Sequence, residues 1–177
     1  MKLIRKPAEE TVVYFYKPYM NLVPDDGKLT QHLKDILAET ETLVATLTEE
    51  QLLHRYAEGK WTIKDLMLHL ADCERVIIYR AMRIARADKT DLPGFDENLL
   101  VATAGANNRD IKKIMAELKA CRASSIAFIE SLDDESLDRT GSANKFEISA
   151  RLLVNHVYGH HKHHLDIIKE RYLAKES

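Results

Sequence analysis

Histidines cluster near the C-terminal end of this 177-residue chain, which contains eight of them. Five lie in a stretch from Ile148 to Leu173, whose apolar spacing predicts one long helix. Neutral imidazole is a common ligand of divalent metal ions, so the helix face that each histidine occupies decides what chemistry it can do. The five are His156, His160, His161, His163 and His164.

Two of them, His160 and His164, fall on the apolar seam of the predicted helix, which also holds Leu153, Val157 and Ile167. They are one turn apart, with roughly 6 Å of axial rise between them, so both imidazoles can reach one ion. A buried imidazole needs partners for both nitrogens, and two on one buried face therefore favour a shared metal. The pair supplies two ligands, so a third must come from another helix.

The other three histidines are interpreted as surface residues rather than ligands. His156 and His163 share a stripe that turns polar toward Glu170. His161 lies on a flank of the helix, where it could also cover a partner helix. Polar residues near a helix C-terminus are favoured by the helix dipole, which supports the surface interpretation.

The third ligand is predicted on an earlier helix over residues 61–87, whose start is capped by Thr62. His69 lies on the inward-facing stripe of that helix. A lone core histidine is more often a hydrogen-bonded packing residue than a ligand. Because His160 and His164 face the same core, we predict that His69 completes a three-histidine metal site.

Glu74 is the candidate catalytic residue. It lies on the stripe beside His69, where its carboxylate could orient an imidazole, accept a proton near the metal, or pair with Arg75 or another cation. Arg122, on a later helix, is either a surface residue or the buried partner of a carboxylate. The sequence leaves both questions open.

The elements that position these residues predict an all-α fold, a four-helix bundle with an irregular N-terminal arm. The two remaining long helices are expected over residues 29–47 and 109–132, with a short helix after a capping box at Thr48. Residues 88–109 break the helical pattern, and we expect this loop to line the pocket. Residues 133–146 are interpreted as a connection, and no convincing sheet is found.

Residues 1–28 are predicted to form the arm, and residues 29–177 a single bundle domain. Three of the four prolines lie in the arm, together with the aromatic run from Val12 to Tyr19. The arm should therefore lie across the bundle or a neighbouring subunit. Its apolar surface is larger than a free tail should expose, so we also predict a homodimer.

Composition excludes several classes of partner. The formal net charge is −2, and Lys and Arg are interspersed with Asp and Glu, so no basic field for nucleic acid or anionic lipid is expected. Cys73 and Cys121 show no metal-binding or disulfide spacing, which suits a reducing compartment. No segment resembles a signal peptide or a membrane span, so a soluble, cytoplasmic protein is expected.

These motifs together resemble the DinB-like superfamily of damage-inducible, metal-binding four-helix bundles, which is unrelated to the DNA polymerase of the same name. The resemblance runs from about Leu29 to Leu173 and rests on Trp61, the segments HLADCE and LPGFDE, and the segment GHHKHHL. It implies that His69, His160 and His164 hold a divalent metal, usually zinc or nickel. Imidazole ligation also favours these two ions, with iron or manganese as alternatives.

Three neutral imidazoles leave such an ion its full charge and an open position, where a bound water or thiol loses its proton more readily. The resemblance implies two reactions on a small-molecule substrate. Some relatives are transferases or isomerases that use a low-molecular-weight thiol cosubstrate, bacillithiol or mycothiol, and others are assigned as metal-dependent hydrolases. The sequence therefore predicts a metal-dependent thiol S-transferase or hydrolase. The alternative is a non-catalytic metal-binding, stress-response bundle.

Overall fold

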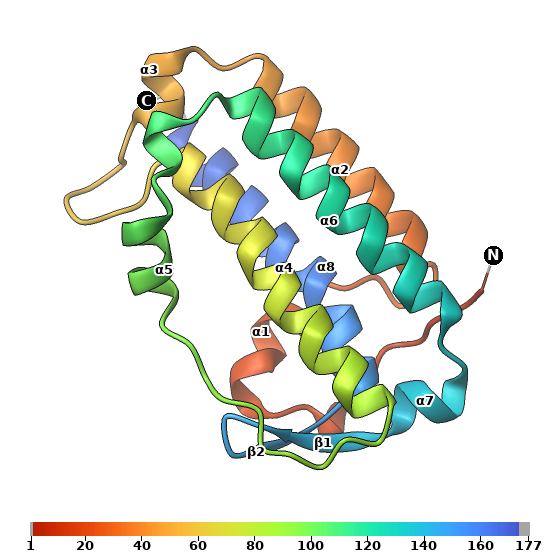
Figure 1. The fold of residues 1–177 in the computed structure, drawn as a ribbon. Helices are drawn as coiled ribbons and strands as arrows, with labels where there is room; N and C mark the ends of the chain where they lie inside the picture. The colour runs from red at the N-terminus through yellow and green to blue at the C-terminus, as the bar shows by residue number, and fades with distance from the viewer. Residues whose placement is uncertain (1, 174–177) are drawn as a thin grey trace.

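The structure, a computed structural model, describes residues 2–173 and consists mostly of helices (Figure 1). Four long helices form the body of the molecule, in agreement with the predicted all-α bundle. They are α2 (Leu29–Ala45), α4 (Ile63–Ala85), α6 (Ile111–Ser131) and α8 (Ala150–Ile167). Among the described residues, no helix is both long and apolar enough to cross a membrane.

The start of α4 is fixed by the capping box that the sequence predicts. Thr62 Oγ1 accepts a hydrogen bond from the backbone N–H of Asp65 at 3.0 Å, and Asp65 Oδ2 accepts one from the N–H of Thr62 at 3.0 Å. A second capping box joins Thr48 and Gln51 at the start of the short helix α3 (Glu49–Leu53). These caps set the phase of each helix, and in α4 that phase turns His69 toward the core.

The remaining helical elements are short. They are the 3-10 turns Glu9–Thr11, Tyr14–Tyr16 and Ala106–Asn108, the helices α1 (Lys17–Met20), α5 (Glu97–Ala104) and α7 (Asp134–Asp138), and the π-helical turn Ile168–Tyr172 that extends α8. Helix α5 lies within the predicted loop 88–109 and runs beside α4 (Figure 1). The prediction that residues 88–109 form a loop is therefore wrong for α5 and for the 3-10 turn Ala106–Asn108, which are helical.

A β-hairpin precedes α8, so the expectation of no sheet is wrong. Strand β1 (Thr140–Ala143) pairs antiparallel with β2 (Phe146–Ser149). The two residues between the strands, Asn144 and Lys145, both have positive φ, at 51° and 65°, as a tight hairpin turn of type I′ requires. The pattern is hard to see in the sequence because the strands are four residues long and Lys replaces the glycine that usually follows Asn in such turns.

The N-terminal arm packs against its own bundle (Figure 1). Five of its apolar side chains are buried in the core, namely those of Ile4, Val12, Tyr16, Met20 and Val23. The sequence predicts that the arm lies across either its own bundle or a neighbouring subunit, and the structure shows it on its own bundle.

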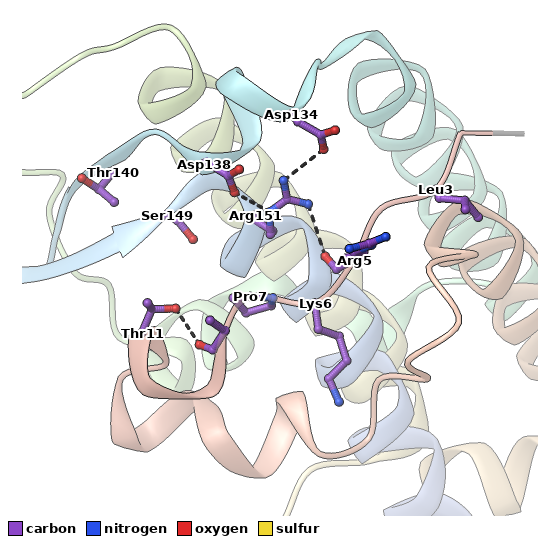
Figure 2. Close-up of a pocket in the computed structure, with 11 residues that line it drawn as sticks. Leu3, Arg5, Lys6, Pro7, Thr11, Asp134, Asp138, Thr140, Ser149 and Arg151 are labelled. Carbon is purple, nitrogen blue, oxygen red and sulfur yellow. Dashed lines mark hydrogen bonds and ion pairs between the residues drawn. The ribbon is translucent and has the colours of Figure 1, made fainter.

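Polar contacts anchor the start of the arm at the hairpin end of α8 (Figure 2). Asn155 Nδ2 donates to the carbonyl oxygen of Arg5 at 3.2 Å, and Arg151 pairs with Asp134 at 3.1 Å and with Asp138. A cavity of about 820 Å³ lies beside these contacts. Its lining contains no histidine and no cysteine, and its two carboxylates, Asp134 and Asp138, pair with Arg151.

Candidate metal centre

Three histidines from two helices converge in the bundle, and we call them the three-histidine centre. Nε2 of His160 lies 3.2 Å from Nε2 of His69 and 3.0 Å from Nε2 of His164. A tetrahedral ion with Zn–N bonds of about 2.0–2.1 Å places two ligand nitrogens about 3.3 Å apart. The structure therefore places His160 at nearly this spacing from both His69 and His164, and one nitrogen from each of the three residues lies within 4.8 Å of the others.

The three facing Nε2 atoms are better suited to binding a shared cation than to forming hydrogen bonds with one another. A neutral imidazole carries one proton, so each Nε2 is either a donor or an acceptor. Nε2 of His160 can match only one of its two neighbours, and in every arrangement of tautomers one of the three facing nitrogens is left without a partner among them. A divalent ion would accept the lone pairs of all three.

Burial keeps these imidazoles neutral, which is the form that binds metal. It lowers the pKa of His69 to about 4. It also lowers the pKa values of His160 and His164 well below the usual range, and the neighbouring imidazoles add to the effect in both. At neutral pH each of the three imidazoles is therefore in the form that can offer one nitrogen lone pair to a metal ion.

Aromatic and sulfur groups surround the centre. The Trp61 ring packs against the His69 ring, with 4.6 Å between centroids. Cys73 Sγ lies 3.5 Å from Nδ1 of His69, and burial raises the pKa of this thiol to about 12. Without a metal ion, Cys73 is therefore a neutral thiol at physiological pH.

The centre opens onto a cavity of about 290 Å³. The arm contributes Phe15, Tyr16 and Tyr19 to its wall, and the connection after α4 contributes Phe95 and Glu97. The expectation that residues 88–109 line the pocket is thus confirmed for two residues. The remaining lining comes from Trp61, from α4 (His69, Cys73, Ile77 and Arg80) and from α8 (His156, His160 and His164).

The surface interpretation is wrong for two of the other histidines. His156 is buried because the arm covers its stripe, and its ring packs edge-on against Tyr16 and Tyr19, with 4.7 Å between centroids in each pair. His161 is fully buried on the opposite flank. His163 alone of the three remains partly exposed.

Glu74 and Arg122 form a buried ion pair, so Arg122 is the buried partner of a carboxylate rather than a surface residue. Arg122 Nε donates to Glu74 Oε1 at 2.9 Å, and Nη2 donates to Oε2 at 2.9 Å. Arg122 Nη1 donates to the carbonyl oxygen of Leu33 at 2.7 Å, and Nη2 lies 2.9 Å from Nδ1 of His161. The network ends where Nε2 of His161 lies 2.8 Å from Thr40 Oγ1. Both Glu74 oxygens are engaged, so the geometry favours pairing over proton transfer.

This network divides the apolar core into two clusters. One cluster includes Leu33, Ile77 and Leu153, and the other includes Leu66 and Leu118. Thr40 and Arg122 each lie between the two clusters along their own helices, whereas Glu74 follows Cys73, which already belongs to the first cluster. The two apolar clusters hold the helices together through side chains other than the three ligand histidines.

Arg80, Glu97 and Tyr19 line the cavity but were not identified from the sequence. Arg80 follows His69 by eleven residues, close to three helical turns, so its position on the same face could have been read from α4. Tyr19 lies in the short helix α1 and Glu97 is the first residue of α5, and the spacing within these short helices does not relate either residue to His69.

Comparison with known proteins identifies the family. A family model of the DinB superfamily matches residues 32–168. The chain belongs to the DinB superfamily, which confirms the resemblance seen in the sequence.

Two relatives share more than a quarter of their aligned residues with the chain. One, from Oceanobacillus iheyensis and named "Putative metal-dependent hydrolase", is 29% identical over 142 residues, which cover 77% of this chain and 81% of the relative. Another, from Geobacillus kaustophilus with the same designation, is 28% identical over 136 residues, which cover 75% of each chain.

The fold is similar to that of YfiT from Bacillus subtilis, with a TM-score of 0.74 and 20% identity. The match covers 94% of this chain and 91% of YfiT, which is described as "a probable metal-dependent hydrolase with an unusual four-helix bundle topology". At this identity the likeness establishes the fold, and the covered share exceeds the bundle domain, so the match extends into the arm.

Proposed function

We propose that this protein is a metal-dependent hydrolase of small molecules, with a divalent ion held by His69, His160 and His164. The convergence of three neutral Nε2 atoms beside a cavity carries the proposal. The designations of the two bacterial relatives support hydrolysis. Imidazole ligation favours zinc or nickel, with iron or manganese as alternative occupants.

A bound ion of this kind lowers the pKa of a coordinated water toward 7 and polarises the oxygen of a carbonyl or phosphoryl group. Trp61 packs on His69 and restricts the orientation of its ring. The aromatic side chains of the arm exclude bulk water from one wall of the cavity. Glu97 brings a carboxylate to the same cavity and is our candidate for accepting a proton.

In this proposal Glu74 is a positioning residue. Its carboxylate holds Arg122, which in turn holds His161, one residue after His160 on α8. The catalytic role predicted for Glu74 would require it to release Arg122, and a substitution described below tests this.

A thiol S-transferase remains the second candidate. In this candidate reaction the metal would hold a low-molecular-weight thiol cosubstrate as its thiolate, next to the buried Cys73 side chain. The third candidate is a non-catalytic metal-binding bundle. A structural zinc site usually has four protein ligands, whereas the described residues supply three here and a cavity adjoins them. This arrangement favours an enzyme.

The test begins with metal analysis of protein purified without a histidine tag. His160→Ala should lose stoichiometric metal, whereas His163→Ala, on the same helix but partly exposed, should keep it. Full metal retention in His160→Ala would contradict the site. The zinc and nickel forms are then assayed on small esters and amides, and on an electrophile with added thiols. Metal binding without turnover in either assay would favour the non-catalytic bundle.

We retain the homodimer as a proposal, although the arm that motivated it packs on its own chain. Leu3 and Tyr14 remain exposed on that arm, at 58% and 73%. Sedimentation at micromolar concentration decides the matter, and a monomer would remove the proposal.

A further inference from the structure

Arg80 is a buried cation without a counterion. Its side chain is 7% exposed, and no carboxylate of the described residues lies within ion-pair distance of it. Each of the other buried Lys and Arg residues in the described part of the chain pairs with a carboxylate. These pairs are Lys64 with Glu49, Arg122 with Glu74, and Arg151 with Asp134 and Asp138. A guanidinium stays protonated in proteins, so its burial calls for an anion.

The surroundings hold Arg80 in place but leave part of its guanidinium available. Nη2 donates to the carbonyl oxygen of Pro93 at 2.6 Å, and the guanidinium carbon lies 5.4 Å from the centroid of the Phe95 ring. Nε and Nη1 of Arg80 donate hydrogen bonds to no described residue, and neither atom is completely buried from solvent. These N–H groups therefore face accessible space, and the space beside Arg80 is the cavity of the three-histidine centre.

About three turns of helix α4 separate Arg80 from the predicted ligand His69. His69 and Arg80 line one face of α4, with Cys73 and Ile77 between them. Eleven residues correspond to about 16 Å of helix rise between the two α-carbons. Both side chains incline toward the N-terminus of α4, and the longer Arg80 side chain reaches further in that direction than the His69 ring, which shortens the separation. A small molecule that occupies the cavity can therefore touch both groups.

We propose that Arg80 binds an anionic group, a carboxylate or a phosphate, on the substrate whose reactive bond lies at the three-histidine centre. This inference rests on the proposed function and adds a substrate class to it. The planar guanidinium presents parallel N–H groups that match two oxygens of either anion. A cavity of about 290 Å³ limits the ligand to a small molecule.

The test uses the single tryptophan of the chain, Trp61, which lines the cavity and reports its occupancy by fluorescence. The zinc-loaded protein is titrated with benzoate, phenyl phosphate and benzamide. At least one of the two anions should bind tighter than neutral benzamide, and the preferred anion identifies the group. Equal affinity for all three would overturn the proposal whatever any variant shows.

Variants separate Arg80 from the metal, which also attracts anions. Arg80→Met keeps the aliphatic stem and should weaken binding of the preferred anion by about 10- to 100-fold while leaving benzamide unchanged. Arg80→Gln provides a second neutral replacement if Arg80→Met fails to fold by circular dichroism. Arg83→Met is the matched control, since Arg83 lies on the same helix but pairs with Asp88 outside the cavity, and its anion affinity should equal that of the wild type. Unchanged anion affinity in a folded Arg80 variant would overturn the proposal.

The outcomes distinguish this inference from the proposed function. Turnover of neutral esters with unchanged anion affinity in Arg80→Met would keep the hydrolase and remove the anion site. Loss of anion affinity in Arg80→Met without turnover of any ester would keep the anion site and remove the hydrolase.

Discussion

The backbone of Tyr19 in α1 lies so close to Gly159 in α8 that no side chain fits between them. A β-carbon at position 159 would lie 2.8 Å from the carbonyl carbon of Tyr19 and closer still to its oxygen. Glycine at this position therefore allows the arm to lie flat on α8, where it covers His156 and forms one wall of the cavity.

Gly159→Ala should displace the arm from α8. Overpacking of this kind typically costs about 1–3 kcal/mol, which we expect as a lower free energy of unfolding in urea denaturation. The loosened arm should also be cleaved faster in limited proteolysis near Tyr19. Unchanged stability together with unchanged cleavage would show that the arm has room to move away without loss.

The helical spacing of the ligands is the part of the site that the sequence predicts. Periodicity is a local property of one helix, so the common face of His160 and His164 follows from their separation of four residues. The inward direction of His69 follows in the same way from the capped start of α4. The structure brings all three together as this reasoning requires.

The burial of His156 and His161 depends instead on which segments cover them. His156 is covered by an arm whose docking leaves no periodic pattern, and His161 is enclosed by Arg122 and Thr40 from distant parts of the chain. Such long-range contacts cannot be derived from the polar stripe of a single helix. The same limitation concealed the partner of Glu74, which lies 48 residues away in the sequence.

Glu74→Gln should destabilise the protein without removing its metal. The substitution leaves the Arg122 guanidinium buried without a counter-charge, which typically costs about 3–5 kcal/mol. Arg75→Gln is the control, because Arg75 is a half-exposed neighbour whose pairs with Asp72 and Glu117 should contribute less than about 1 kcal/mol. Urea denaturation and metal analysis give the two readouts. A lower rate in Glu74→Gln with normal stability and metal content would instead assign Glu74 to proton transfer.

Removal of the metal should leave the helices folded. The two apolar clusters pack the helices through side chains that are not metal ligands. Circular dichroism in a chelator should therefore retain the helical spectrum at room temperature. Added zinc should raise the melting temperature by mass action, corresponding to about 2.7 kcal/mol at a hundred times its Kd. Complete unfolding in the chelator would make the metal structural.

Acidification should destabilise the metal-free protein between about pH 6.5 and pH 4. Burial lowers the pKa of His69 to about 4 and that of His156 to about 3, whereas an unfolded histidine titrates near 6.5. Between these values the unfolded chain binds more protons than the folded chain, so the free energy of unfolding falls as pH falls. This stabilisation is complete above pH 6.5, and the His69 shift alone corresponds to about 3 kcal/mol.

Urea denaturation of the chelated protein from pH 7.5 to pH 4.5 measures this dependence. His156→Phe keeps an aromatic ring against Tyr16 and Tyr19 but removes a titrating group, so its stability should fall less steeply with pH than that of the wild type. His54→Phe, at an exposed position, should have the slope of the wild type. Equal slopes in all three proteins would show that His156 is not held neutral by burial. Zinc should stay bound below pH 6, because the low pKa values of its ligands delay competition from protons.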